Sequence, residues 1–324
     1  MTEQSQKILS DFQIRKSSGQ KRAFRAWLRR ELEGAGWTVT EERGRFSGTN
    51  VIAGDPEKAE VLFTAHYDTQ AVLPFPNFIT PRNMGVYLLY QLLIVVVMFF
   101  AVAVVSFCSA LIGYMAELPT LAAMLPGWLV CAFCIWWVFF GKANRHTAND
   151  NTSGVVTLLE SALTLPPELR EKACFVFFDN EERGMLGSAA FARKHKRVKT
   201  EKLVLNFDCV SDGSSIQFYP TTALKKDGAA LARIEGAFLP QSGKTVEVVR
   251  GFGFYPSDNA SFRRAAGVCA LKKGKRLGWY MDRIHTGRDT VFQEENITLL
   301  TDGIRRMLTD AEAACPERGG TCHA

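Results

Sequence analysis

Two long apolar stretches stand out in the pattern of hydrophobic and polar positions along the chain. No Asp, Glu, Lys or Arg occurs within residues 83–116 or 118–141. A helix needs about 20 mainly apolar residues to cross a hydrocarbon core roughly 30 Å thick. We therefore predict two membrane spans, at about 86–115 and 118–140. The alternative is a pair of buried helices within a large soluble core.

A short connector around Glu117 makes the two spans a hairpin whose outer ends lie on the same side of the membrane. Arg82 precedes the first span and Lys142 follows the second, whereas the connector carries no Lys or Arg. Positive residues favour the cytoplasmic side, so we predict a two-span protein of the cell membrane whose remaining chain is cytoplasmic. The chain then divides into a first catalytic part, an inserted hairpin and a second catalytic part, at residues 1–81, 82–142 and 143–324.

Short apolar runs predict strands elsewhere, at 50–53, 60–65, 174–178 and 202–207. Helical spacing of apolar residues predicts an amphipathic helix from Lys21 to Gly36 and a closing helix from about Gln293 to Ala314. Three of the predicted strands run directly into His, Asp or Glu residues. Catalytic side chains of open α/β sheets gather at such carboxyl ends.

Composition agrees with a globular enzyme and argues against other classes. The chain has 324 residues, is 47% hydrophobic and carries a net charge of +6 without a long basic run, so nucleic acid is not an expected partner. The N-terminus lacks the apolar core of a signal peptide. Several of the eight cysteines lie inside apolar runs, which fits a reducing compartment. No pattern sets the oligomeric state.

Adjacent carboxylates, Glu181 and Glu182, follow the strand predicted at 174–178. In a dizinc hydrolase one such carboxylate can bind a metal while its neighbour takes the proton from the metal-bound water. A Glu-Glu pair on an arbitrary helix is usually a solvated face. The pair therefore indicates a metal site only if other segments supply further metal ligands.

Candidate ligands occur in four other segments. His66 follows a predicted strand, and Asp68 lies two residues on, on the same face, where it can fix the tautomer of the His66 ring. A lone His after a strand can also be structural. Asp150 precedes a buried helix, either as an N-terminal cap or as a carboxylate that bridges two metals. Asp208 ends a strand, and His285 lies in a late polar loop.

Six motifs carry a joint resemblance, in chain order: TAHYD (64–68), ANDNTSG (148–154), FFDNEERGMLGS (177–188), NFD (206–208), SDNASF (257–262) and IHTGRDT (284–290). Together they resemble the zinc-dependent exopeptidase family that includes bacterial leucyl aminopeptidases, glutamate carboxypeptidase and glutaminyl cyclases. The resemblance covers about Arg22 to Ala314 without the hairpin. It implies an α/β fold of the phosphorylase/hydrolase-like type, in which helices sandwich a mixed, mostly parallel eight-stranded sheet.

The resemblance also implies the site residues and two co-catalytic zinc ions. One zinc would be held by His66, Asp150 and Asp208. The other would be held by Asp150, Glu182 and His285, with Asp150 as the bridge. Glu181 would be the general base that accepts the proton of a metal-bridging water, and Asp68 would orient His66.

The implied activity is that of a membrane-anchored dizinc metallopeptidase, an aminopeptidase that hydrolyses the N-terminal peptide bond of short peptides. The expected partners are a peptide or small amide substrate and the lipid bilayer. Two alternatives stay open: another amide hydrolase or glutaminyl-cyclase-like acyl transferase on the same site, and a noncatalytic membrane receptor or scaffold. Asn180 and Asn259 depart from the family pattern, which usually has Gly at the first position and often His at the second.

Overall fold

Nine strands form one mixed sheet in the order β1-β2-β4-β3-β5-β8-β6-β7, with β9 paired only to β8. The computed structural model describes residues 1–313, so Cys315, Cys322 and the last residue of the predicted closing helix lie outside the described residues. The strands are β1 (Val39–Gly44), β2 (Gly48–Ala53), β3 (Val61–His66), β4 (Ala173–Phe178), β5 (Leu203–Phe207), β6 (Ser215–Pro220), β7 (Thr245–Val248), β8 (Ala265–Gly274) and β9 (Gly278–Tyr280). The expected mixed sheet is confirmed, and β9 adds a short strand to the predicted eight.

The centre of the sheet is parallel and fully covered. Strands β4, β3, β5 and β8 run parallel to one another, and every residue of β3, β4 and β5 is buried. Strands that are covered on both faces read as continuous apolar runs in the sequence. This is why the runs at 60–65, 174–178 and 202–207 predicted strands within one residue of their observed bounds.

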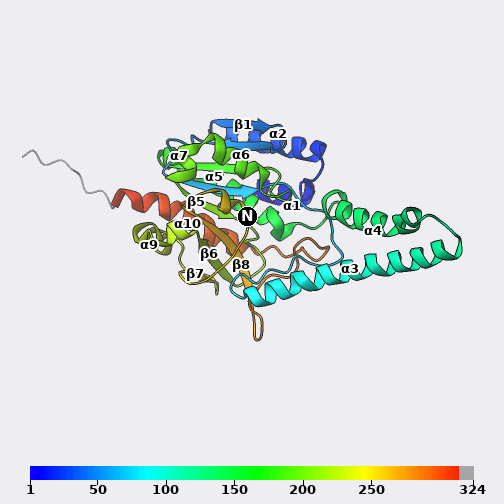
Figure 1. Ribbon diagram of the computed structural model, residues 1–324. Coiled ribbons are helices and arrows are strands. Elements are labelled where there is room, and N and C mark those ends of the chain that lie inside the picture. The colour runs from blue at the N-terminus through cyan, green and yellow to red at the C-terminus, as the bar shows by residue number, and fades with distance from the viewer. Residues whose placement is uncertain (314–324) are drawn as a thin grey trace, which may run out of the picture.

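Helices cover both faces of the sheet (Figure 1). One face packs against α1 (Glu3–Asp11), α2 (Ser18–Gly34), α5 (Gly154–Thr164), α8 (Thr222–Lys225), α9 (Gly228–Ala237) and α10 (Glu294–Ala313). The other face packs against α6 (Leu186–Lys194), α7 (Lys196–Thr200) and the short helix η3 (Asp258–Ser261). Two further short helices are η1 (Ala148–Ser153) and η2 (Pro167–Lys172).

Helix α2 begins three residues before the start predicted from its apolar spacing. Ser17 caps the helix, because its hydroxyl accepts a hydrogen bond from the backbone N–H of Gln20 while the Gln20 side chain accepts from the N–H of Ser17. Such a capping box satisfies two N–H groups that have no partner inside the helix. The start of α2 is therefore set by a polar motif.

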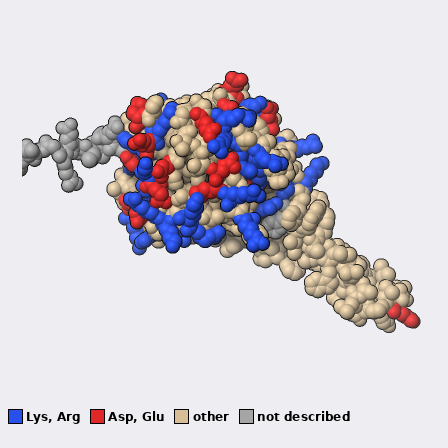
Figure 2. Space-filling model, turned by 90° about the horizontal axis from the view of Figure 1, so that it is seen from above, with Lys and Arg blue, Asp and Glu red and all other residues tan. Residues whose placement is uncertain are grey.

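The two apolar stretches form helices α3 (Met84–Met115) and α4 (Thr120–Phe140), which project from the body as a hairpin (Figure 1). Both are long and apolar enough to cross a membrane, and 0% of the most apolar window of α3 and 11% of that of α4 is buried. The alternative of two buried core helices therefore does not describe them. Figure 2 shows Lys and Arg side chains over the body and a hairpin surface almost free of charge.

Small residues let the two hairpin helices approach closely. A Cβ atom on Gly113 would lie 2.4 Å from the Cβ of Ala123, and one on Gly127 would lie 1.9 Å from Oγ of Ser106. Close backbone approach at small residues is the usual basis of helix association in membranes. The contact between α3 and α4 is thus built like that of a membrane helix pair.

Helix α3 is longer than its partner and also contacts the body. It has 32 residues against 21 in α4, an excess of eleven residues, or about 16 Å of helix. Near its start, the Tyr90 hydroxyl donates a hydrogen bond to the carbonyl of Pro76 at 2.8 Å, and the Tyr87 ring lies 6.4 Å from that of Phe254. The first turns of α3 are therefore docked on the body.

Candidate metal centre

Three neighbouring strands deliver polar side chains to one edge of the sheet. His66 is the last residue of β3 and lies opposite Phe178, the last residue of β4. Glu182 follows β4 after a short turn, and Asp208 follows β5 directly. Because parallel strands end at a common edge, residues that are far apart in sequence meet there.

The short helix η1 brings Asp150 to the same edge. The side-chain Oδ1 of Asn149 accepts hydrogen bonds from the backbone N–H groups of Ser211 at 2.8 Å and Asp212 at 3.0 Å. These bonds tie η1 to the segment that follows β5. The N–H of Gly154, the first residue of α5, donates a hydrogen bond of 3.0 Å to Oδ1 of Asn151 and not to Asp150, so the alternative interpretation of Asp150 as a helix cap does not describe its contacts.

The structure brings together all five residues that the sequence indicates as metal ligands. In one group, Nε2 of His66 lies 3.4 Å from Oδ1 of Asp150 and 3.4 Å from Oδ1 of Asp208. In the other, Nε2 of His285 lies 3.0 Å from Oδ2 of Asp150 and 3.2 Å from Oε2 of Glu182. The donor atoms of each group lie within 4.8 Å of one another. Asp150 belongs to both groups, with one oxygen facing each imidazole.

The ring of His66 is held by the main chain of Asp68. Its Nδ1 lies 3.1 Å from the carbonyl oxygen of Asp68, and since a carbonyl only accepts, Nδ1–H is the donor. Nε2 is then the nitrogen with a free lone pair, which faces the carboxylates of the first group. The Asp68 carboxylate, to which the sequence assigns this task, faces the same nitrogen, with its Oδ1 3.6 Å from Nδ1.

The carboxylate of Asp68 also holds the loop that carries the two glutamates. Its Oδ1 accepts a hydrogen bond from the backbone N–H of Glu181 at 3.0 Å, and its Oδ2 accepts one from that of Glu182 at 3.3 Å. The preceding Asp179 is engaged elsewhere, in a buried ion pair with Lys21. Asp68 therefore connects the end of β3 to the loop after β4.

Left-handed backbone conformations occur at three positions in or beside the site. Asn180, Cys209 and His285 have φ values of 56°, 57° and 63°. Such a conformation costs about 1–3 kcal/mol for a residue other than Gly and is frequent at functional sites. Asn is among the residues that tolerate it best, which accounts for Asn180 at a position where the resembled family usually has Gly.

Mutual interactions shift the protonation of these groups. Burial alone would lower the pKa of His66, but the carboxylate of Glu181 and the nearby aspartates raise it well above its ordinary value. The pKa of His285 is raised in the same way, against the effect of burial, by neighbouring carboxylates. Burial also raises the pKa of Glu181 and of Glu182 above the ordinary range of a carboxyl group. The site therefore holds negative charge that lacks full compensation by protein groups.

The donor set fits zinc. Each group offers one imidazole nitrogen and two carboxylate oxygens, which are ligand types that zinc binds. Oε1 of Glu182 is buried without a hydrogen-bond partner, although a buried carboxylate oxygen is costly to leave unpaired. Divalent cations would satisfy that oxygen and offset the excess negative charge.

Asp289 supports the site but was not singled out by the sequence. Its Oδ1 accepts a hydrogen bond from the backbone N–H of Asn149 at 2.8 Å, and its Oδ2 accepts one from that of Asp150 at 2.9 Å. Burial raises the pKa of Asp289 to about 7. The IHTGRDT motif contains this residue four positions after His285, and that spacing is the only signal in the sequence.

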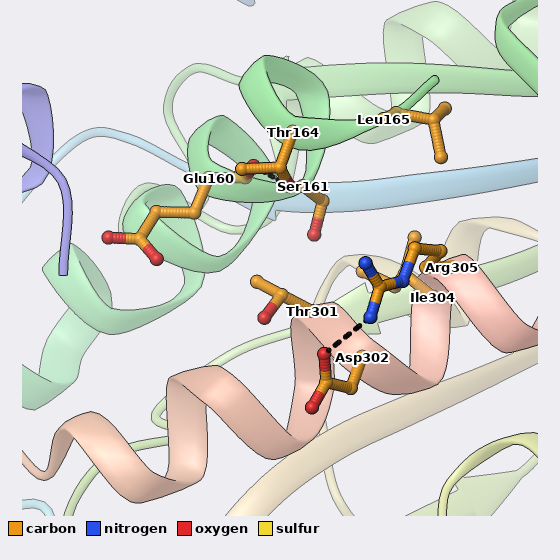
Figure 3. A pocket seen from close by; sticks show the side chains of 8 residues that line it. All are labelled: Glu160, Ser161, Thr164, Leu165, Thr301, Asp302, Ile304 and Arg305. Carbon is orange, nitrogen blue, oxygen red and sulfur yellow. Dashed lines mark hydrogen bonds and ion pairs between the residues drawn. The ribbon is translucent and has the colours of Figure 1, made fainter.

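A separate cavity of about 160 Å³, shown in Figure 3, lies between α5 and α10. It is lined by residues 160–165 at the end of α5 that lies away from Asp150. An ion pair of 3.3 Å between Arg305 and Asp302 crosses its rim. The cavity holds no part of the metal centre.

Comparison with solved structures supports the fold. The LapA aminopeptidase of Legionella pneumophila is 14% identical, with a TM-score of 0.57, over 95% of this chain and 69% of that chain. A glutaminyl cyclase of Porphyromonas gingivalis is 16% identical, with a TM-score of 0.58, over 95% of this chain and 96% of that chain. A Zn-dependent exopeptidase of Parabacteroides distasonis is 15% identical, with a TM-score of 0.54, over 95% and 96%. No curated protein matches the chain.

Comparison with protein families matches residues 138–305 to Peptidase family M28. The matched range contains Asp150, Glu182, Asp208 and His285, whereas His66 precedes it. His66 is joined to that range by the strand pairing of β3 and by its contacts in the first ligand group. Since the match spans more than half of the chain, the protein belongs to Peptidase family M28 and is a hydrolase of the metallopeptidase type.

Proposed function

We propose that the protein is a membrane-anchored dizinc aminopeptidase that hydrolyses the N-terminal peptide bond of short peptides. The observation that carries the proposal is the position of Asp150, whose two oxygens face two separate imidazoles at 3.4 Å and 3.0 Å. One carboxylate shared by two ligand groups is the arrangement that a pair of metal ions needs. The proposal assigns His66 and Asp208 to one zinc and Glu182 and His285 to the other.

Zinc bound there would lower the pKa of a water molecule and polarise the scissile carbonyl. We assign the acceptance of the water proton to Glu181, which belongs to neither ligand group. Its backbone N–H is fixed by Asp68, and burial raises the pKa of its carboxyl group well above the ordinary value. A carboxylate with a raised pKa can accept a proton from water and return it to the leaving nitrogen.

The proposed membrane attachment uses α3 and α4 as spans. Arg82 and Lys142 at the outer ends, and the absence of Lys and Arg from the connector, favour a cytoplasmic catalytic part. The base of the hairpin is close to the site, because Ala71 pairs with Ala143 and the N–H of Val72 donates to the carbonyl of Lys142 at 2.8 Å. The metal centre would therefore lie near the membrane surface, which favours short peptides.

The main alternative is another amide hydrolase, or an acyl transferase that cyclises N-terminal glutamine. The shared fold with the Porphyromonas gingivalis glutaminyl cyclase supports keeping it. A noncatalytic receptor or scaffold would not need Glu181 beside five metal-binding side chains. The proposal and its alternatives differ in the substrates that they predict the protein to convert.

A substrate comparison with the purified, detergent-solubilised protein tests the proposal. We expect cleavage of aminoacyl amides that carry a free α-amine, no cleavage of their N-acetylated forms, and about two zinc ions per chain by metal analysis. Cleavage of N-blocked amides would favour another amide hydrolase. Ammonia release from glutaminyl peptides without peptide-bond cleavage would favour the cyclase. No turnover of either substrate class by zinc-loaded protein would favour the noncatalytic role.

A further inference from the structure

A second cavity, of about 320 Å³, is lined in part by Arg183, which directly follows Glu182 of the second ligand group. We refer to it as the basic pocket, and it is lined by Lys16, Ser17, Gln20, Phe140, Ala143 and Arg183. These residues come from the start of α2, the end of α4 with the segment after it, and the loop that follows β4. The hairpin thus supplies part of the wall of this pocket.

The lining of the basic pocket favours an anion. It contains two cationic side chains and no Asp or Glu. The guanidinium of Arg183 lies over the ring of Phe140, with its central carbon 6.0 Å from the ring centre, which restricts the directions that the guanidinium can take. The N-terminus of α2, a helix of 17 residues, adds the partial positive charge of its dipole.

The same segments of the chain carry residues of the basic pocket and of the metal centre. Arg183 directly follows Glu182 of the second ligand group, and the side-chain amide of Gln70 donates a hydrogen bond to the carbonyl of Glu182 at 3.4 Å. On the opposite wall, Lys16 follows Arg15, whose guanidinium donates to the carbonyl of Tyr67 beside the first ligand group. The second ligand group and the pocket are thus joined through consecutive residues of one loop, Glu182 and Arg183.

We propose that the basic pocket binds the α-carboxylate of a short peptide whose scissile bond lies at the metal centre. The inference rests on the proposed function and narrows its substrate class to peptides with a free C-terminus close to the cleaved bond. Arg183 and Lys16 supply charge-assisted hydrogen bonds, which are the strong type for a carboxylate. Phe140, the last residue of α4, lines the pocket on the side of the hairpin. An acidic lipid headgroup offers a similar anion, but the link through Glu182 favours a ligand that also occupies the metal centre.

The test compares a dipeptide with its C-terminal amide, using the zinc-loaded full chain in detergent. We expect kcat/KM for the free acid to exceed that for the amide by about tenfold or more, the usual value of hydrogen bonds to a charged group. Arg183→Gln and Lys16→Met should each lower this ratio toward one. Arg145→Gln is the matched control, because Arg145 is exposed and follows α4 without lining the pocket, and the ratio should persist in it.

Several outcomes would overturn the inference. Equal cleavage of acid and amide by the parent would refute it while leaving the proposed peptidase function intact, and so would an equal loss of the ratio in Arg145→Gln. If neither peptide is cleaved, calorimetric binding of N-acetyl-alanine against N-acetyl-alanine amide still decides whether the pocket holds a carboxylate. A ratio that disappears in nanodiscs of phosphatidylglycerol but persists in those of zwitterionic phosphatidylcholine would assign the pocket to the headgroup of an anionic lipid.

Discussion

The backbone N–H of Glu181 donates a hydrogen bond of 3.0 Å to the carboxylate of Asp68. The two residues are 113 positions apart in sequence, and each lies two or three residues after the end of a parallel strand. This bond fixes the main chain from which the proposed general base extends. The position of the base is therefore set by a carboxylate that is not assigned to any metal.

Replacing Asp68 with Asn should misplace the loop while leaving His66 in place. The amide keeps one oxygen acceptor for two N–H donors, whereas the carbonyl that holds Nδ1 of His66 belongs to the main chain and remains. We expect kcat to fall by about 10- to 100-fold, within the range of partner mutations at metal sites, with zinc content near that of the parent. A loss of zinc equal to the loss of activity would show that Asp68 acts on the ligands instead.

Glu181→Gln should abolish turnover without removing metal. The amide has nearly the shape of the carboxylate but cannot accept a proton, and general base catalysis contributes about 10²–10⁴-fold. Steady-state kinetics beside metal analysis of the same preparation provides the measurement. If the variant kept activity close to that of the parent, another group would have to be the base.

Asp150→Ala should cost more metal than Asp208→Ala. The first change removes an oxygen from both ligand groups and the second removes one from a single group. We expect Asp150→Ala to retain little zinc and Asp208→Ala to retain about one ion per chain. The same partial loss in both variants would argue against a bridging role for Asp150.

The metal-free protein should lose stability as pH rises, in part through Asp258. This carboxyl is fully buried, and burial raises its pKa to about 7 from an ordinary value of 3.8. A raised pKa means that the folded state holds the proton more tightly, so the stabilisation is full below pH 3.8 and is lost as pH rises through about 7. Each pKa unit corresponds to about 1.36 kcal/mol.

Thermal unfolding of chelator-treated protein between pH 4 and pH 8 measures this effect. Asp258→Asn removes the titrating group, so its melting temperature should fall less over that range than that of the parent. Parallel curves for parent and variant would mean that Asp258 does not titrate there.

The predictions from sequence worked best where a buried strand runs into a polar residue. His66, Glu182 and Asp208 each follow a continuous apolar run, and the parallel pairing of those runs is what brings the three side chains together. An apolar run signals both the strand and its end. The order of the motifs along the chain therefore predicted that the candidate ligands lie close together.

The sequence did not predict the contacts that single polar groups make with residues far away in the chain. We predicted the ring of His66 as the partner of Asp68, because the two lie on one strand face, but no pattern predicted that the same carboxylate accepts a hydrogen bond from a backbone 113 positions away. No pattern in the sequence singled out Arg15, yet its side chain is fully buried. Asp289 lies between Arg288 and Thr290, and nothing in that context predicts its hydrogen bond from the N–H of Asp150. In each case tertiary packing determines the partner, and the spacing of residues along the sequence does not predict it.

The last prediction separates the hairpin from the chemistry. The hairpin leaves and re-enters the body beside the pairing of Ala71 with Ala143, which can form without the spans. We would replace residues 84–140 by a Gly/Ser linker of about 12 residues, which keeps the carbonyl of Lys142 for Val72 and has a root-mean-square span of roughly 19 Å. That span covers the offset of about 16 Å left by the longer α3. The variant should be soluble and bind zinc as the parent does.

The kinetics of the linker variant should show whether the hairpin contributes to catalysis or only to the basic pocket. Turnover of an aminoacyl amide should persist, because no ligand or base lies within 84–140, whereas the preference for a free C-terminal carboxylate should weaken, since Phe140 is gone from the basic pocket. Labelling of a cysteine introduced at Glu117 in the full chain tests the membrane arrangement, and it should react from the side opposite the catalytic part. Two results would contradict this view: labelling of both regions from one side, or a folded, zinc-bound linker variant with no activity on any small substrate that the parent cleaves.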